Sequence, residues 1–160
     1  MGERIDELVA RLRKGIRKTA EIFSGLNDEQ WRKVLYTEPP TWTVRDLLAH
    51  FLSAEEGLLR IMQNVAAGGP GAPEDFDYNA YNADEQARLA GIAPQTLLTD
   101  LAVARETTIA WVTGLDEADL ERTGRHPALG EVTLEVFING IYGHQLMHMR
   151  DLQTLLQLKT

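Results

Sequence analysis

Apolar residues recur every three or four positions along most of this chain, and this period predicts amphipathic helices. The clearest stripe runs through residues 3–24 and stops at Gly25, a residue type that commonly follows the end of a helix. The same period predicts three further long helices, over about 44–66, 94–112 and 133–158. No segment shows convincing strand alternation, so the pattern predicts an all-α protein built from four long helices.

Polar residues and prolines mark where these helices begin. Thr43 is a candidate N-cap with Asp46 three residues later, which is the spacing of a capping box. Pro94 suits the first turn of the third helix, and Thr133 suits the N-cap of the fourth. Between the first two helices, the segment NDEQWRKVLY predicts one or two further helical turns that end before a Pro-Pro pair.

The connections between the helices are long. Residues 67–93 begin with AAGGPGAP, which cannot be helical, and contain a short predicted helix around Asp84–Leu89. At about 3.3 Å per residue this segment can span a helix several times, so neighbouring helices can be parallel. GLNDEQW at 25–31 resembles GLDEADL at 114–120, which indicates either a duplicated helix pair or a local pattern that is common after long helices. We predict a single four-helix-bundle domain over residues 1–160.

The composition excludes several kinds of chemistry and of binding partner, although it says little about the fold. The chain has no cysteine, which excludes thiolate ligands and a cysteine nucleophile, so any thiol would have to arrive on a small molecule. A net charge of −8 without a basic patch argues against nucleic-acid binding. No apolar run approaches the roughly 18 residues of a membrane span, and the charged first residues do not resemble a signal peptide. We therefore expect a cytoplasmic protein with no membrane partner.

Two of the four histidines lie one turn apart in the predicted fourth helix. A rotation of about 100° per residue places His144 and His148 in the middle of the apolar stripe of that helix. His50 lies at the edge of the apolar stripe of the second helix, whereas His126 falls in a loop. Three inward imidazoles can form a metal site with an open coordination position, for zinc, nickel, iron or copper. Core histidines, however, more often bond a carbonyl, a carboxylate or a water.

The order of the elements and several short motifs resemble the DinB-like superfamily. The matching pieces extend over nearly the whole chain and are GLNDEQW, WTVRDLLAH at 42–50, GLDEADL, LGEVTLE at 129–135 and HQLMH at 144–148. The resemblance implies an up-down-down-up four-helix bundle with long crossover connections. It also implies one divalent metal ion, zinc or nickel before other metals, bound by His50, His144 and His148.

The same resemblance narrows the expected activity. Characterised relatives include bacillithiol transferases and mycothiol-dependent maleylpyruvate isomerase, and other members are described as metal-dependent hydrolases or damage-inducible proteins. We therefore expect a metal-dependent hydrolase, or a transferase that uses a low-molecular-weight thiol, acting on a small-molecule substrate. The alternative is a stress-response bundle protein that binds a metal or ligand without catalysis. The sequence identifies no catalytic nucleophile or general base among the protein's own residues.

Two carboxylates could orient the ligand imidazoles from outside the metal site. Asp46 precedes the first expected ligand by one helical turn, and Asp151 follows the last by three residues. Asp46 could instead serve only to cap its helix, and Asp151 could be a surface ion-pair partner. The resemblance also implies a homodimer, in which Trp111 and Leu156, apolar residues off the main stripes, could cover a partner.

Overall fold

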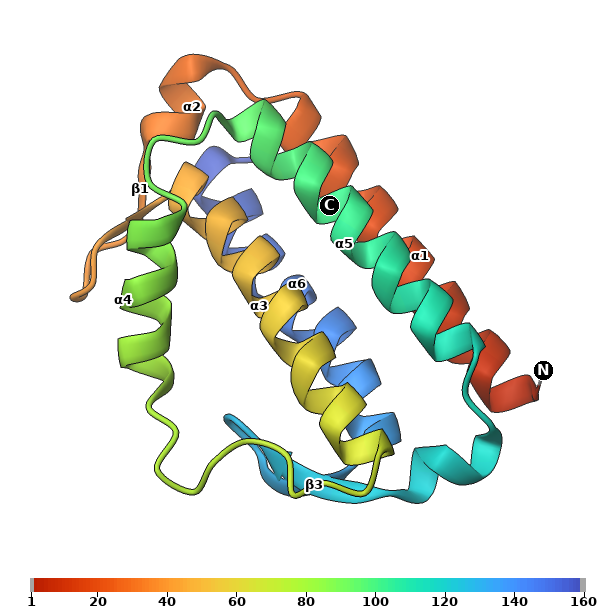
Figure 1. Cartoon of the computed structure of the whole chain (residues 1–160). Helices are drawn as coiled ribbons and strands as arrows, with labels where there is room; N and C mark the ends of the chain where they lie inside the picture. Colours follow the sequence, from red (N-terminus) through yellow and green to blue (C-terminus); the bar gives the residue numbers. More distant parts are fainter. Residues whose placement is uncertain (1, 159–160) are drawn as a thin grey trace.

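The computed structural model describes residues 2–158, which form a bundle of four long helices (Figure 1). These helices are α1 (Glu3–Ser24), α3 (Val44–Ala66), α5 (Pro94–Thr113) and α6 (Leu134–Leu156). Both α1 and α3 pack against α5 and α6, so α1 and α3 occupy opposite corners of the bundle. α1 and α6 run in one direction and α3 and α5 in the other, which confirms the up-down-down-up bundle (Figure 1).

Three of the predicted helix starts are confirmed, two of them by side-chain capping hydrogen bonds. The Thr43 hydroxyl accepts a hydrogen bond from the backbone N–H of Asp46, whose carboxylate accepts one from the N–H of Thr43. Pro94 is the first residue of α5. The Thr133 hydroxyl accepts a hydrogen bond from the N–H of Val136 at the start of α6. The local sequence therefore determines where these helices begin, and with that the phase of each helix.

Two short β-hairpins, which the sequence pattern did not predict, accompany the helices of this all-α fold. β1 (Val34–Tyr36) pairs antiparallel with β2 (Trp42–Thr43), and β3 (Thr123–His126) pairs with β4 (Gly130–Thr133). The NDEQWRKVLY segment is therefore a short helix, α2 (Asp28–Arg32), followed by a strand. Alternation becomes recognisable over about four to eight residues, so strands this short leave no reliable signal in the sequence.

The order long helix, short helix, hairpin, long helix occurs twice along the chain. In the second half the short helix is the 3-10 helix η1 (Glu117–Glu121), which corresponds to α2 in the first half. Both short helices begin with a capping box. This repeated order of elements is what a duplicated helix pair would produce.

The long connection after α3 contains one further helix, α4 (Tyr78–Arg88), which begins earlier than the helix expected around Asp84–Leu89. Its N-cap is Asp77, whose carboxylate accepts hydrogen bonds from the backbone N–H groups of Asn79 and Ala80. The helix packs against α3 at the outside of the bundle (Figure 1). None of its residues is buried, and a helix without a buried stripe leaves a weak periodic signal.

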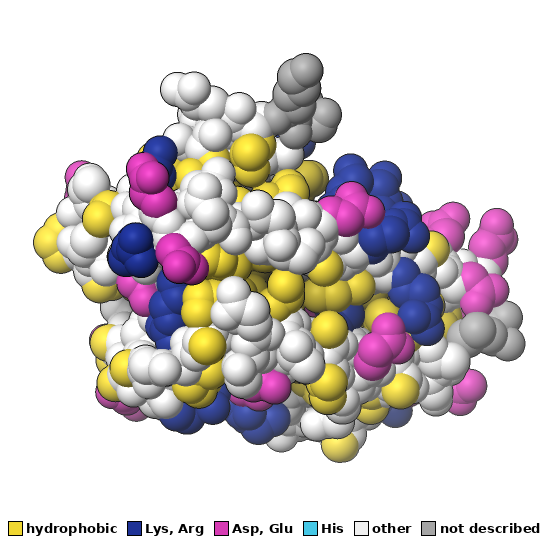
Figure 2. All heavy atoms as spheres, turned by 90° about the horizontal axis from the view of Figure 1, so that it is seen from above, with side chains coloured by type: hydrophobic (Ala, Val, Ile, Leu, Met, Phe, Trp, Pro, Cys, Tyr) yellow, Lys and Arg dark blue, Asp and Glu magenta, His cyan; other side chains and the backbone are white. Residues whose placement is uncertain are grey.

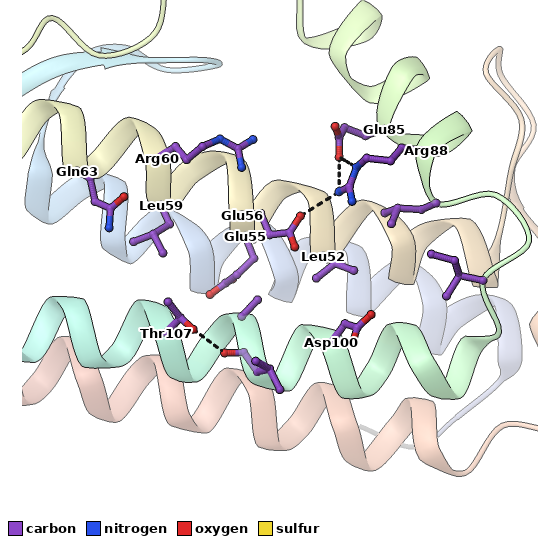
Figure 3. Close-up of a pocket in the computed structure, with 14 residues that line it drawn as sticks. Leu52, Glu55, Glu56, Leu59, Arg60, Gln63, Glu85, Arg88, Asp100 and Thr107 are labelled. Carbon is purple, nitrogen blue, oxygen red and sulfur yellow. Dashed lines mark hydrogen bonds and ion pairs between the residues drawn. The ribbon is translucent and has the colours of Figure 1, made fainter.

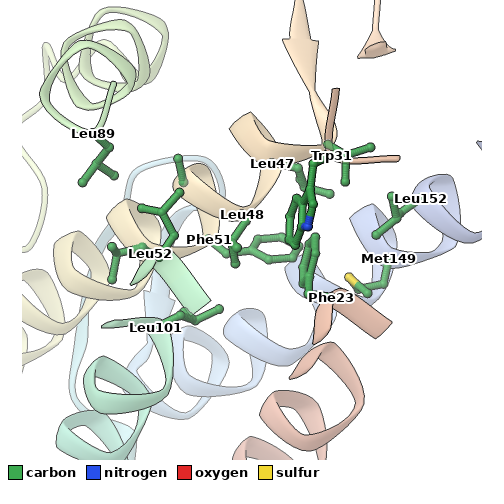
Figure 4. Packing of buried hydrophobic residues seen from close by; sticks show 13 residues of the cluster. Phe23, Trp31, Leu47, Leu48, Phe51, Leu52, Leu89, Leu101, Met149 and Leu152 are labelled. Carbon is green, nitrogen blue, oxygen red and sulfur yellow. The ribbon is translucent and has the colours of Figure 1, made fainter. Parts of the chain in front are cut away.

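Two buried apolar clusters fill the bundle, one near each end. In the cluster near α2, the rings of Phe23 and Trp31 stack with centroids 5.3 Å apart, and Phe51 packs edge-on against Phe23 (Figure 4). The second cluster joins the start of α1, the end of α3 and the first turns of α6. The two clusters hold the four helices together at both ends, as burial of apolar area does in any bundle.

A buried ion pair lies between the two clusters and links three helices. The Nε and Nη2 atoms of Arg105 on α5 donate to the carboxylate of Glu55 on α3, at 2.7 and 2.9 Å. The Nη1 atom of Arg105 donates to the carbonyl oxygen of Leu12 on α1, at 2.8 Å. Both side chains are almost fully buried, with exposed fractions of 0 % and 1 %. The charges therefore depend on each other for compensation.

The surface does not test the expected homodimer, which stays a prediction. Trp111 and Leu156 are partly buried and pack against the two apolar clusters, so much of their apolar surface is used within the chain. At the end of the bundle that carries α2, apolar side chains gather in the middle of the surface between scattered charged ones (Figure 2). Among the described residues, no helix combines the length and the apolar character needed to cross a membrane.

Candidate metal centre

His50 lies in the second turn of α3, close to the hairpin formed by β1 and β2. The capped start at Thr43 sets the phase of α3 and turns His50 inward, where only 8 % of it is exposed. The ring of Trp42 lies 4.7 Å from the His50 ring, measured between centroids. The imidazole is therefore held between an aromatic side chain of the hairpin and the body of the bundle.

His144 and His148 lie one turn apart on α6, but they are not in the middle of its buried stripe. The fully buried line of α6 passes through Ile141, Gln145 and Leu152, whereas both histidines are partly exposed. The prediction that the two histidines lie in the middle of the apolar stripe is therefore wrong by a fraction of a turn. They lie on the flank of α6 that faces the start of α3, while Gln145 takes a buried position on the same helix.

The three imidazoles converge on one point. The Nε2 atom of His144 lies 3.0 Å from Nε2 of His50 and 3.1 Å from Nε2 of His148. One nitrogen from each ring lies within 4.8 Å of the nitrogens of the other two. Two nitrogens that bind the same zinc-like ion, each at about 2.0–2.1 Å, are roughly 3 Å apart. The donors therefore fit one divalent ion, and their role as its ligands stays a prediction.

The surroundings keep these imidazoles neutral. Burial, followed by the neighbouring charges of His144 and His148, lowers the pKa of His50 to about 3. Burial, followed by the charges of His148 and His126, lowers the pKa of His144 to about 4. Burial also lowers the pKa of His148, although the carboxylate of Asp151 opposes this effect. A neutral imidazole has a lone pair on one ring nitrogen, which metal binding requires.

Tyr36, on β1, connects His148 to Asp151. Its hydroxyl donates to a carboxylate oxygen of Asp151 at 2.6 Å and lies 2.6 Å from Nδ1 of His148. Burial and the hydrogen bond to Asp151 raise the pKa of Tyr36 well above its usual value, so the phenol keeps its proton. Because that proton is directed to Asp151, the hydroxyl oxygen accepts from Nδ1–H of His148. This tautomer leaves the lone pair of His148 on Nε2, which faces the other two histidines.

Sequence reasoning did not identify Tyr36. The sequence leaves Asp151 either as a carboxylate that orients a ligand imidazole or as a surface ion-pair partner, and in the structure it accepts a hydrogen bond from this phenol. The signal that could have identified Tyr36 is its place in VLY, three residues before a Pro-Pro pair, once that segment is read as a hairpin strand. The hairpin carries both Tyr36 and Trp42 to the histidines, with their rings 6.3 Å apart.

Asp46 makes its hydrogen bonds elsewhere. Its carboxylate accepts from the backbone of Thr43 and from the guanidinium of Arg45. The Nδ1 atom of His50 is buried and has no hydrogen-bond partner among the described residues. A role for Asp46 in orienting His50 therefore finds no support in a direct contact and stays a prediction.

His126 is placed near the centre without joining it. It ends β3, and its Nδ1 accepts hydrogen bonds from the backbone N–H groups of Ala128 and Leu129, at 3.0 and 3.2 Å. Its ring packs against Phe137 on α6, with centroids 4.9 Å apart. It is not one of the three convergent imidazoles, as predicted, although it ends a strand rather than lying in a loop, and it lies near enough to influence the pKa of His144.

A large hollow on the protein lies away from the histidines. It is a groove of about 650 Å³ between α3, α4 and α5, and Figure 3 shows its lining. The acidic side chains there are mostly paired: Glu56 and Glu85 both bond Arg88, and Glu55 bonds Arg105. The groove contains no convergent set of titratable groups, so size alone does not identify the site of chemistry.

Comparison with known proteins identifies a family and a shared fold. A family model described as the DinB superfamily matches residues 11–152. No curated protein sequence matches the chain. Among solved structures, the fold is similar to YfiT from Bacillus subtilis, described as a probable metal-dependent hydrolase with an unusual four-helix bundle topology, at 17 % identity and a TM-score of 0.75. That match covers 99 % of this chain and 91 % of YfiT.

Two further solved structures share the fold. One is the mycothiol-dependent maleylpyruvate isomerase, at 17 % identity and a TM-score of 0.76, where the match covers 95 % of this chain and 63 % of the isomerase. The other is the colibactin self-resistance protein ClbS, in complex with double-stranded DNA, at 16 % identity and a TM-score of 0.70. The match covers 93 % of this chain and 94 % of ClbS. Identities this low show a shared fold and leave the chemistry to the site.

Proposed function

Because the chain belongs to the DinB superfamily, we propose that it is a metal-dependent enzyme for a small-molecule substrate, with one divalent ion held by His50, His144 and His148. The ion is zinc or nickel in this proposal, since neutral imidazole suits both. The reaction is either hydrolysis or transfer to a low-molecular-weight thiol. The chain acts in the cytoplasm and as a homodimer in this proposal.

The observation that carries the proposal is the convergence of three Nε2 atoms, of which that of His148 has its lone pair directed inward by a hydrogen bond on the other ring nitrogen. His144 Nε2 lies about equally far from two other ring nitrogens, at 3.0 and 3.1 Å, and a single N–H cannot donate well to both. Tyr36 sets His148 in the tautomer that a ligand needs. One ion would give all three lone pairs a partner and so relieve the cost of burying them.

In the proposed chemistry the ion acts as a Lewis acid, and side chains of the protein position its ligands and exclude water. A divalent ion supplies a Lewis acid that lowers the pKa of a coordinated water or thiol. Tyr36 and Asp151 hold His148 in position from the hydrogen-bonded side. Trp42 covers His50 and excludes water from that side of the centre. The chain has no cysteine of its own, so a thiol route requires an external thiol.

DNA binding, as in the ClbS complex, is not part of this proposal. Phosphate contacts by Lys and Arg supply much of the affinity in protein–DNA complexes. This chain has 16 basic and 24 acidic residues, and its guanidinium groups include several that are already paired with carboxylates, such as Arg88 and Arg105. The prediction that it binds no nucleic acid is therefore retained.

Metal titration tests the proposal directly. Protein purified without a histidine tag would be analysed for bound metal, stripped and titrated with Co²⁺, whose visible absorption reports the coordination. We expect one ion per chain, and a loss of affinity in His144→Ala that exceeds the about 10–100-fold caused by losing a supporting hydrogen bond. His126→Asn is the matched control and should bind Co²⁺ like the wild type. Equal affinity of His144→Ala and wild type would refute the site.

Activity assays then separate the two reaction classes. Thiol transfer to an electrophile such as monochlorobimane, and hydrolysis of small esters and amides without thiol, would be measured with metal-loaded protein. Activity that requires added thiol supports the transferase, and activity without thiol supports the hydrolase. A metal-loaded protein that is inactive in both would favour the non-catalytic binding protein.

A further inference from the structure

The surface of α6 beside His144 is unusually open for the middle of a helix. A methyl group added to Gly143 would meet nothing within 4 Å, and one added to Gly140 would meet only Nε2 of His126, at 3.9 Å. Glycine weakens a helix interior relative to alanine, and packing gives no reason for it at either position. The neighbouring side chains Val136 and Met147 are 41 % and 53 % exposed. We call these four residues the open face of α6.

The open face borders the three-histidine centre on one side. Gly140 lies one turn before His144 on the same side of α6, because residues four apart stack along a helix. The opposite flank of the histidines is closed by the core line of α6, and His50 is covered by Trp42. The open face is therefore the side of α6 on which the side chains next to His144 are smallest.

His126 borders the same face with one free ring nitrogen. Its Nδ1 accepts two backbone hydrogen bonds in the β3–β4 turn, so the proton of the neutral ring is on Nε2. Both hydrogen bonds that it makes with described residues use Nδ1, and Nε2 faces α6 at Gly140. Packing against Phe137 fixes the ring plane. The result is an N–H donor held beside Gly140, which lies one helical turn before the ligand His144 on α6.

We propose that His126 is a substrate-positioning residue, whose Nε2–H donates to an acceptor oxygen of a molecule that reacts at the three-histidine centre. The proposal rests on the proposed function and deepens it by naming the substrate class. Since the open face has no charged side chain and the donor can only donate, the fitting ligand is a small carboxylate or carbonyl compound. Its acceptor oxygen would lie a few bonds from the atom at the centre.

Two thiols of similar length provide a binding test that does not depend on activity. In 3-mercaptopropionate the carboxylate can reach His126 while the sulfur lies at the centre, and 1-propanethiol has no acceptor. Both would be titrated into Co²⁺-loaded protein, with the cobalt–thiolate absorption as readout. We expect the wild type to bind 3-mercaptopropionate more tightly than 1-propanethiol by about tenfold or more, the effect of one hydrogen bond to a charged group.

Two substitutions of His126 separate the role of its Nε2–H donor from that of Nδ1, which accepts hydrogen bonds in the β3–β4 turn. His126→Asn keeps an acceptor near the position of Nδ1 and removes the distal N–H, so the preference for 3-mercaptopropionate should disappear while 1-propanethiol binds as before. His126→Gln restores an N–H near the distal position and should recover part of the preference. Gly140→Ala narrows the space at His126, so it should weaken 3-mercaptopropionate binding although it raises Tm by improving helix propensity.

The outcomes distinguish this proposal from the metal proposal. Wild-type protein that fails to bind Co²⁺ would overturn both. If His126→Asn binds Co²⁺ normally and keeps the full preference for 3-mercaptopropionate, only the role of His126 is overturned. A loss of Co²⁺ affinity in His126→Asn would also overturn that role, because it would make His126 part of the metal site rather than a neighbour that holds the substrate.

Discussion

Glu55→Gln provides the most demanding test of how this bundle is stabilised. The substitution keeps the shape of the side chain and removes its charge, which leaves the guanidinium of Arg105 buried without a counterion. In the native protein that guanidinium makes two hydrogen bonds to the carboxylate, at 2.7 and 2.9 Å, and is 0 % exposed. Since it cannot lose its proton, the unbalanced charge stays inside the fold.

The expected loss is large for a single substitution. Breaking a buried ion pair by removing one partner lowers the free energy of unfolding by about 3–5 kcal/mol. The whole stability of a domain is typically about 5–15 kcal/mol, so this loss is a substantial fraction of it. At about 2–4 °C per kcal/mol for a chain of this length, Tm should fall by roughly 6–20 °C. Thermal and urea unfolding, followed by circular dichroism, measure both quantities.

An exposed ion pair between Arg13 on α1 and Glu106 on α5 is the matched control. Glu106 accepts from Arg13 at 3.1 Å, and the two side chains are 61 % and 54 % exposed. Because water screens this pair, Glu106→Gln should cost no more than about 1 kcal/mol. The double substitution Glu55→Leu with Arg105→Met should recover much of the loss, since no charge then remains buried. A Glu55→Gln effect as small as that of Glu106→Gln would refute the reasoning.

The remaining predictions concern the histidine centre. Tyr36→Phe removes the acceptor for Nδ1–H of His148 and should weaken Co²⁺ binding by about 10–100-fold, and unchanged affinity would rule out the tautomer argument. In metal-free protein, the pKa of His144 is lowered to about 4 in the folded state, below its ordinary value of 6.5, so unfolding takes up a proton between these pH values. Stability is therefore fully present above about pH 6.5 and should decrease toward pH 4, by up to about 1.4 kcal/mol per pH unit. His50 extends the same loss of stability toward pH 3. Urea unfolding at several pH values measures how steeply the free energy of unfolding falls with pH. This dependence should be weaker in His144→Ala between pH 6.5 and pH 4.

The sequence by itself determined the helices and most of their ends. Apolar spacing and capping residues such as Thr43, Pro94 and Thr133 act within a few positions along the chain, so they can be read without knowing what packs where. His144 and His148 could be placed together for the same reason, since residues four apart on a helix are always neighbours. The order of the motifs led to the DinB-like bundle and, by resemblance, to His50.

Only the tertiary structure decided the arrangement around the histidines. The short strand that carries Tyr36 exists because it pairs with β2, a contact that no local pattern records. The exact rotation of α6, which moves the histidines to the flank of its core line, depends on what Gln145 and the other three helices bury together. Tyr36 makes its hydrogen bonds with His148 and Asp151, which are more than 100 residues away in the sequence. His126 approaches Gly140 across two different elements, β3 and α6. Such contacts depend on the packing of whole helices against each other, and that packing is a property of the folded molecule rather than of any segment.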